Sequence, residues 1–300
     1  MMDELDGKVV AGFWICPCLE RRDSLYSVAE GATWEWVHMK RRIAVASQKG
    51  GVGKTTTAVN LAAGLGLAGQ RCLLVDLDPQ ANATSGLGVE KPVKVGVADV
   101  LYRPELAVES LCREVAPGVD MIPSGGPMRA AEARLSQTYA GVGPLASGLG
   151  RVENDYDFVV IDCPPSLGAL TTMALLTCHT VVIPMLCEFY AMEGLAQVVG
   201  TIGALRKSRN PRLRIEGILF TMFDTSAEVG YEVIADVRSH FEDQVFDAII
   251  PRDPAVCEAP SHGLSIFDYD LRSRGARAYL ELTREVVARH DEEQKAGTGA

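Results

Sequence analysis

The sequence has no apolar run of the roughly 20 residues that a transmembrane helix needs, so we expect no membrane-spanning segment. It also has no excess of positive charge, because 39 acidic residues stand against 29 basic ones and give a net charge of −10. The molecule as a whole is therefore not a polycation, and any contact with nucleic acid would need a local basic patch. No internal repeat is visible.

Paired cysteine motifs are missing as well. Eight cysteines are scattered along the chain, at positions 16, 18, 72, 112, 163, 178, 187 and 257. Most of them sit in apolar stretches, which is typical of buried free thiols in a reducing cytosol. Cys16 and Cys18 lie close together, but no matching second pair follows, which argues against a metal site there.

The first 38 residues differ from the rest of the chain. They hold all three tryptophans, show no clear periodicity, and lack the ordered regions of a signal peptide. We expect residues 1–38 to be either a flexible extension or a misassigned start. A single folded domain is expected over residues 39–290, followed by a frayed polar tail at 291–300.

Strand-like runs alternate with helical stretches from Ile43 onward. Strands are predicted at 43–47, 72–76, 119–122, 158–162, 180–184, 215–221 and 245–250. Helices are predicted at 54–67, 128–139, 168–177, 188–207, 228–241 and 274–290, with a surface loop at 141–150. Near-continuous apolar strands that alternate with helices predict an α/β fold: a mostly parallel, twisted central sheet flanked by helices on both faces.

A glycine-rich loop joins the first strand to the first helix. It follows the phosphate-binding pattern G-x-x-x-x-G-K-[ST], in which backbone N–H groups surround phosphate oxygens, the lysine reaches the β- and γ-phosphates, and the hydroxyl binds Mg²⁺. Its residues are Lys49, Gly50, Gly51, Val52, Gly53, Lys54, Thr55 and Thr56. The strand–loop–helix order places a phosphate at a helix N-terminus, where free N–H groups favour an anion.

The loop departs from the general pattern at two positions. The first expected glycine is absent, and a second lysine, Lys49, lies inside the loop. Lys54 and the backbone amides suffice to hold a nucleotide within one subunit. The additional cation therefore favours a nucleotide that is bound by a facing subunit.

Three aspartates follow apolar strands. Asp76 and Asp78 come after one strand and Asp162 ends another. Ligands of open α/β sheets bind at the carboxyl ends of the strands, so these carboxylates are expected beside the glycine-rich loop. They could hold Mg²⁺ or orient an attacking water; a solvated turn at a strand end is the alternative interpretation.

These motifs together resemble the ParA/Soj family of deviant Walker A ATPases, which partition chromosomes, plasmids and other cargo. The resemblance rests on residues 49–56, 75–80 and 160–166, with further matches at 187–195, 217–224 and 250–261. It extends from about residue 41 to about residue 287, and it implies the P-loop NTPase fold with ATP and Mg²⁺ as cofactors.

The resemblance also implies a role for each motif residue. Lys49 resembles the signature lysine that reaches the partner's phosphates, and Asp78 the aspartate that supports hydrolysis by positioning water. Thr55 and Asp162 resemble the Mg²⁺ ligands, and Asp76 is expected beside them. The adenine would be bordered by residues 221–224, which include Met222, and by Pro251 and Arg252.

The family mechanism implied is a switch. Because ATP would be bound between two subunits, the bound nucleotide would determine whether the protein is a monomer or a dimer. The ATP dimer would bind DNA without sequence preference in the cytoplasm, on the nucleoid, and a ParB-like partner would stimulate hydrolysis. Membrane binding is not expected, because acidic residues at 291–293 follow the last helix, where anionic lipid would repel them.

DNA binding would require phosphate contacts from lysine and arginine. A basic group ends the helix at 188–207 and continues into the next turn, and a second group could extend it. The first group is Arg206, Lys207, Arg209, Arg212 and Arg214, and the second is Arg252, Arg272, Arg274 and Arg277. A solvated helix end is the alternative for the first group.

The basic set is nevertheless thinner than the resemblance implies. Gly203, Ser226 and Ala255 stand where relatives carry arginines, and Glu228 adds a negative charge. A ParA-like ATPase that positions a protein cargo, with weak or no DNA binding, is therefore the alternative function.

Overall fold

The computed structural model describes residues 40–138, 143–188 and 191–298. The expected extension at 1–38, with Cys16 and Cys18, lies outside the described residues. No helix within the described ranges is long and apolar enough to cross a membrane.

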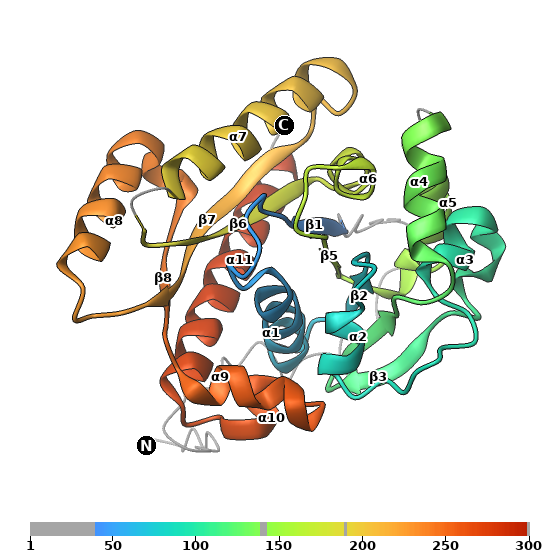
Figure 1. The fold of residues 1–300 in the computed structure, drawn as a ribbon, viewed down its shortest axis with the longest axis horizontal. Helices are drawn as coiled ribbons and strands as arrows, with labels where there is room; N and C mark the ends of the chain where they lie inside the picture. The colour runs from blue at the N-terminus through green and yellow to red at the C-terminus, as the bar shows by residue number, and fades with distance from the viewer. Residues whose placement is uncertain (1–39, 139–142, 189–190, 299–300) are drawn as a thin grey trace, which may run out of the picture. The chain divides into compact units, whose positions relative to one another are not determined.

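An eight-stranded sheet forms the centre of the domain, in the order β3-β4-β2-β5-β1-β6-β7-β8 (Figure 1). All neighbouring strands are parallel except the edge pair β3 and β4. The strands are β1 (Arg41–Val45), β2 (Cys72–Asp76), β3 (Cys112–Ala116), β4 (Val119–Ile122), β5 (Phe158–Asp162), β6 (Thr180–Leu186), β7 (Arg214–Phe223) and β8 (Val245–Pro251). The predicted mostly parallel sheet is confirmed.

Helices cover both faces of this sheet. The longer ones are α1 (Lys54–Leu67), α4 (Met128–Thr138), α5 (Gly143–Leu149), α6 (Ala169–Thr177), α7 (Ala191–Ser208), α8 (Glu228–Phe241) and α11 (Arg274–Thr298). The shorter ones are α2 (Asn82–Gly86), α3 (Val97–Tyr102), α9 (Pro254–Glu258) and α10 (Ile266–Asp270), with 3₁₀ turns at Pro104–Ala107, Glu153–Asp155, Glu242–Gln244 and Ala259–His262.

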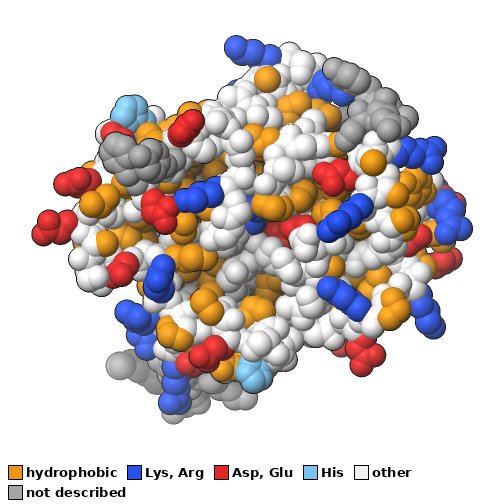
Figure 2. Space-filling view, viewed as in Figure 1, with side chains coloured by type: hydrophobic (Ala, Val, Ile, Leu, Met, Phe, Trp, Pro, Cys, Tyr) orange, Lys and Arg blue, Asp and Glu red, His pale blue; other side chains and the backbone are white. Residues whose placement is uncertain are grey.

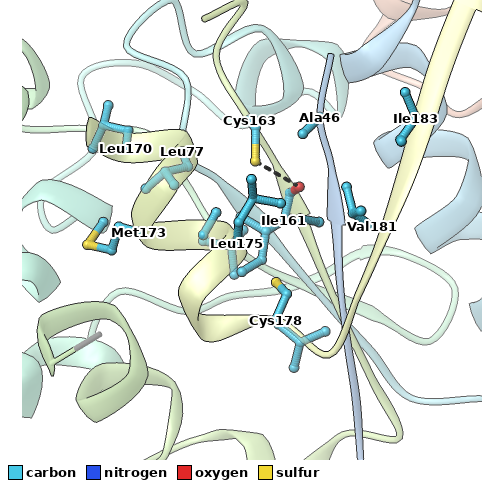
Figure 3. Close-up of a cluster of buried hydrophobic side chains, with 14 of the residues drawn as sticks. Ala46, Leu77, Ile161, Cys163, Leu170, Met173, Leu175, Cys178, Val181 and Ile183 are labelled. Atoms are coloured by element: carbon cyan, nitrogen blue, oxygen red, sulfur yellow. Dashed lines mark hydrogen bonds between the residues drawn. The ribbon is translucent and has the colours of Figure 1, made fainter. Parts of the chain in front are cut away.

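Two hydrophobic clusters divide the core, one on each face of the sheet. Successive strand residues point to opposite faces, so Ala44 joins the cluster under α3 to α8 while Ile43 and Val45 join the one under α1, α2, α10 and α11. Figure 3 shows part of the first cluster, where Ile161, Leu175 and Cys178 pack between the sheet and α6. Burial on both faces explains why the central strands read as continuous apolar runs.

Two predicted irregular segments are helical instead. Residues 143–149 form α5, because Leu145 and Leu149 are both buried four residues apart on one face. Gly148 is needed there for close packing, since a Cβ at this position would lie 2.4 Å from Cγ1 of Val100. Gly148 therefore serves a tight contact between α5 and α3.

The last helix also continues past its predicted end at 290. α11 runs to Thr298, and Glu293 pairs with Arg41 at 3.3 Å and with Arg214 at 2.9 Å. His290 packs on the ring of Phe158, with centroids 4.8 Å apart. Long-range ion pairs thus hold a polar segment that composition alone suggested to be frayed.

The edge strand β3 escaped prediction because its sequence is charged. It pairs antiparallel with β4 through a hairpin that turns at Gly118, where φ is 71°. Arg113 and Asp120 face each other across this hairpin at 2.5 Å. Charged residues are common on edge strands because they oppose pairing with another chain.

Candidate functional site

The candidate site lies at the carboxyl ends of the central strands. β1 pairs with β5 on one side and β6 on the other, and β5 pairs with β2. Asp76 and Asp162 are direct partners across the β2–β5 pair, and Asp162 is also the partner of Val45. The sheet register therefore brings both carboxylates beside the loop that leaves β1, as the sequence predicted.

The glycine-rich loop has a backbone that only glycine adopts easily. Gly51 and Gly53 have φ values of 72° and 80°. Among the described residues, no atom lies within 4 Å of a Cβ built at Gly50 or Gly51, so the space before the loop is open. Gly53 is the N-cap of α1 and has no side chain that could accept hydrogen bonds from the first N–H groups of the helix. These N–H groups are therefore available to an anion.

Lys54 is buried at the start of α1 and turns back onto its own loop. Its Nζ donates to the carbonyl oxygen of Lys49 at 2.7 Å. Burial lowers the pKa of the Lys54 ammonium, while the carboxylates of Asp162 and Asp78 oppose that shift. The amine is thus held at the glycine-rich loop, close to the carboxylates of Asp162 and Asp78.

Asp162 is fully buried, and neither carboxylate oxygen accepts a well-formed hydrogen bond from the described part of the chain. Burial raises its pKa well above the ordinary range and the Asp76 charge adds to this, while nearby Thr55 and Lys54 favour the ionised form. A buried, unpaired carboxylate is costly unless a cation compensates it. Asp162 and the Thr55 hydroxyl fit Mg²⁺, which takes one or two protein oxygens and keeps several waters.

Asp76, the other predicted Mg²⁺ residue, is engaged with its own chain. Oδ2 accepts from the backbone N and the hydroxyl of Thr84, at 2.8 and 2.6 Å, and Oδ1 accepts from the N of Asp78 at 3.2 Å. Burial raises the pKa of this carboxyl, and the bonds from Thr84 oppose the rise. These bonds compete with the predicted metal contact.

Asp78 lies just beyond the end of the sheet. The last sheet bond on this side joins the N of Leu77 to the O of Asp162 at 3.0 Å. Oδ1 of Asp78 accepts from the N of Gln80 at 2.9 Å, and the residue is only 5% exposed. The side chain is therefore held near Lys54 in a site with little water, where a carboxylate can orient a reacting water.

Lys49, the second lysine of the loop, is exposed and forms an ion pair. Its Nζ lies 2.5 Å from Oε2 of Glu188, just beyond β6. Glu188 was not predicted as a site residue. No local signal could have found this pair, because 139 positions separate its members.

The residues predicted to border adenine lie beside the loop at the ends of β7 and β8. Phe223 pairs with Pro251, and the N of Arg252 donates to the O of Phe223 at 2.9 Å. Met222 has a φ of 52° and is partly exposed, and a Cβ at Gly53 would lie 3.7 Å from its Cε. Strained backbone of this kind is often found at binding sites.

Thr221 begins the segment that was expected to border the adenine, and it also contacts the glycine-rich loop. Its hydroxyl lies 2.9 Å from the O of Val52 and 3.1 Å from the O of Met185. It therefore connects the glycine-rich loop to β6 and β7, and holds the loop against the adenine side of the site.

The two predicted basic groups do not form one patch. Arg206, Lys207 and Arg209 are exposed where α7 ends, near the start of β7, whereas Arg252 follows the end of β8. Because β7 and β8 are parallel neighbours, these groups lie at opposite ends of the strands, and the expected extension of one group by the other is wrong. Figure 2 shows lysine and arginine interspersed with acidic side chains on the face viewed, rather than gathered in one area.

Comparison with known proteins agrees with this arrangement. Residues 40–215 match the family model described as AAA domain. The sporulation initiation inhibitor protein Soj of Bacillus subtilis (strain 168) is 47% identical over 251 residues, which are 83% of this chain and 99% of Soj. The chromosome partitioning protein ParA of Caulobacter vibrioides (strain NA1000 / CB15N) is 44% identical over 257 residues, covering 85% of this chain and 96% of ParA.

A solved structure supports the nucleotide assignment. Cobyrinic acid a,c-diamide synthase from Mycobacterium smegmatis, with bound ATP analog and magnesium, superposes with a TM-score of 0.71 at 36% identity. The match covers 82% of this chain and 93% of that one. The glycine-rich loop, the unpaired Asp162 and these relatives lead to one conclusion: the chain belongs to the ParA/Soj family and is a P-loop ATPase that uses ATP and Mg²⁺.

Proposed function

We propose that this ATPase is a switch that dimerises around ATP, binds DNA without sequence preference, and drives chromosome or plasmid partitioning. It would act in the cytoplasm, on the nucleoid, with a ParB-like partner that stimulates hydrolysis. The relatives named for chromosome partitioning support this role. The observation that carries the proposal is Lys49, an exposed cation inside a phosphate-binding loop that already has Lys54.

Within one subunit, the loop would hold the triphosphate. The N–H groups of residues 50–56 would bind phosphate oxygens. Lys54 would give up its hydrogen bond to the O of Lys49 and donate to the phosphate oxygens instead. Thr55 and Asp162 would hold Mg²⁺, which neutralises phosphate charge. Asp78 accepts a hydrogen bond from the attacking water and aligns it with the γ-phosphate.

Between subunits, Lys49 would leave Glu188 and reach the partner's phosphates. An ammonium at the γ-phosphate is a contact that ADP does not offer, so ATP stabilises the dimer more than ADP does. A ligand shifts an equilibrium only by its difference in affinity for the two states, and this contact supplies such a difference.

The separation of the basic groups supports the alternative, a positioning ATPase for a protein cargo with weak or no DNA binding. Arginine and lysine groups at opposite ends of the strands would not contact one DNA duplex in a single protomer. The ATP dimer could still present one of the groups twice, which is why the two functions need a direct test.

The test is binding to random duplex DNA, measured by fluorescence anisotropy with ATP and with ADP across a salt series. The Asp78→Ala variant suppresses turnover during the titration. ATP-dependent binding that weakens steeply with salt supports the DNA switch. Absence of binding at low salt, with ATP-dependent dimers present, would instead support the protein-cargo function.

A further inference from the structure

A buried hydrogen-bond network connects Asp76 to the backbone of Asp78 through side chains that were not predicted for the site. It includes two side chains, Thr84 in α2 and Ser124 after β4, and both are almost completely buried. Neither belongs to the glycine-rich loop or to the predicted Mg²⁺ ligands.

The Thr84 hydroxyl uses its hydrogen-bonding capacity in two directions. It donates to Oδ2 of Asp76 at 2.6 Å and accepts from the backbone N of Ser124 at 2.9 Å. The same Asp76 oxygen accepts from the backbone N of Thr84 at 2.8 Å. This threonine therefore joins the ends of β2 and β4.

Ser124 completes the path to Asp78. Its hydroxyl donates to the backbone O of Asp78 at 2.7 Å. The backbone N of Asp78 donates to Oδ1 of Asp76 at 3.2 Å. The network thus fixes both the N–H and the C=O of Asp78, and this fixes the position of the backbone that carries its carboxylate.

The segment after Asp78 explains why such fixing is needed. Ala81 has a φ of 55°, a left-handed conformation that is unfavourable for alanine, and it is the N-cap of the short helix α2. The Nζ of Lys91 donates to the O of Ala81 at 2.9 Å. A strained turn persists only where its surroundings determine it, and here the surroundings are the network and this lysine.

The geometry points to Thr84 and Ser124 as positioning residues for hydrolysis, which act by setting the place of the Asp78 carboxylate through Asp76 and the Asp78 backbone. The inference rests on the proposed role of Asp78 in aligning water. It also gives Asp76 a function in holding this loop, separate from metal binding. A displacement of about 1 Å at a reacting group can cost a large factor in rate, so loss of either hydroxyl should affect turnover.

The experiment compares four variants with the unmodified full-length protein. Thr84→Val removes the hydroxyl at nearly constant shape, Ser124→Ala breaks the bond to Asp78, and Thr84→Ser retains the hydroxyl. Thr177→Val is the matched control, because Thr177 is also buried and its hydroxyl donates to a backbone O, that of Met173, in α6.

Thr84→Val and Ser124→Ala should lower kcat about tenfold or more, with affinity for a non-hydrolysable ATP analogue changed by less than about threefold. Thr84→Ser should restore kcat, and Thr177→Val should leave it unchanged. Melting temperatures of all four variants separate this effect from loss of folding. If Thr84→Val fails to fold, Ser124→Ala still tests the inference.

Asp78→Ala distinguishes the two levels of the proposal. If Asp78→Ala loses turnover while Thr84→Val and Ser124→Ala hydrolyse ATP at the normal rate, the positioning inference is overturned and the role of Asp78 stands. If Asp78→Ala itself hydrolyses ATP normally, the proposed role of Asp78 is wrong and the inference falls with it.

Discussion

Two lysines of one loop have opposite environments in this protein, although only five positions separate them. Lys54 is buried and bonded to the loop backbone, whereas Lys49 is exposed and paired with a distant glutamate. A buried amine is placed to serve the nucleotide of its own subunit. An exposed amine can reach a nucleotide bound by a partner subunit. The two lysines would therefore have different roles, Lys54 in nucleotide binding and Lys49 in dimerisation.

Replacement of Lys54 should abolish nucleotide binding. Lys54→Ala removes the charge-assisted bond to the phosphates, so we expect the affinity for ATP to fall at least about 100-fold. Isothermal titration calorimetry measures this directly, and circular dichroism shows whether the variant is folded. Retained micromolar affinity would contradict the assigned role.

Glu188 should restrain Lys49 in the free protomer. Glu188→Gln removes the partner charge in both subunits of the dimer, and each exposed ion pair is worth up to about 1 kcal/mol, so dimerisation with ATP should strengthen by up to about 30-fold. Light scattering against protein concentration measures it. Lys49→Ala is the control and should lose the ATP-dependent dimer. A weaker dimer in Glu188→Gln would mean that Glu188 contacts the partner instead.

Asp162 should make the nucleotide-free protein less stable as the pH rises. Its pKa is raised in the folded state, so the folded protein holds the proton more tightly than the unfolded chain does. The contribution of Asp162 to stability is therefore greatest below the ordinary carboxyl range and falls as the pH rises from there through the raised pKa. Asp162→Asn should weaken this dependence and increase the melting temperature at neutral pH.

The same variant should lose Mg²⁺-dependent hydrolysis, because an amide does not supply the negative charge that Mg²⁺ prefers. Thermal melts across the pH range, with and without Mg²⁺ and ATP, measure both effects. An Asp162→Asn protein that is less stable at neutral pH would show that the carboxylate is compensated by a partner other than the metal.

At the scale of elements, the ends of the helices and strands depend on contacts that lie far away in the chain. α1 begins at Lys54 and ends at Leu67 as predicted, because the glycine-rich loop fixes its start and its apolar spacing is regular. α5 and the last turns of α11 were not predicted as helix. Their signals are the packing of Gly148 against Val100 and the ion pairs of Glu293, and neither appears in a local window.

Glu293 should stabilise the end of α11. Arg41 is buried and keeps Glu216 at 2.6 Å, so Glu293→Gln should cost only about 1 kcal/mol. Glu292→Gln is the matched control: Glu292 is the exposed neighbour on the same helix and should change stability very little. Urea denaturation measures the free energy of unfolding of both variants. Equal losses in the two variants would show that the effect comes from the change in net charge and not from the ion pairs of Glu293.

At the scale of the whole molecule, the placement of charge decides how DNA could bind. A net charge of −10 repels DNA at long range, so binding must come from a surface where basic residues are concentrated. The two basic groups lie at opposite ends of the strands, and one of them should dominate DNA binding.

We expect the group at the end of α7 to be the DNA surface. The Arg206→Ala/Lys207→Ala double variant should weaken ATP-dependent binding and reduce the slope of log K against log salt by about 1.8, since each phosphate contact contributes about 0.9. Arg272→Ala/Arg277→Ala is the control, with the same change in charge at the other end of the strands. The reverse result would place DNA beside the nucleotide.

The sheet class, the phosphate loop and the choice of Lys54, Asp78 and Asp162 as site candidates follow from local sequence patterns. These patterns are readable because buried parallel strands and phosphate loops require particular residue types at fixed spacing. The partner that each charged side chain takes is set by the tertiary fold. Glu188 beside Lys49, Thr84 and Ser124 around Asp76, and the separated basic groups all depend on the order and register of strands, which no local pattern encodes.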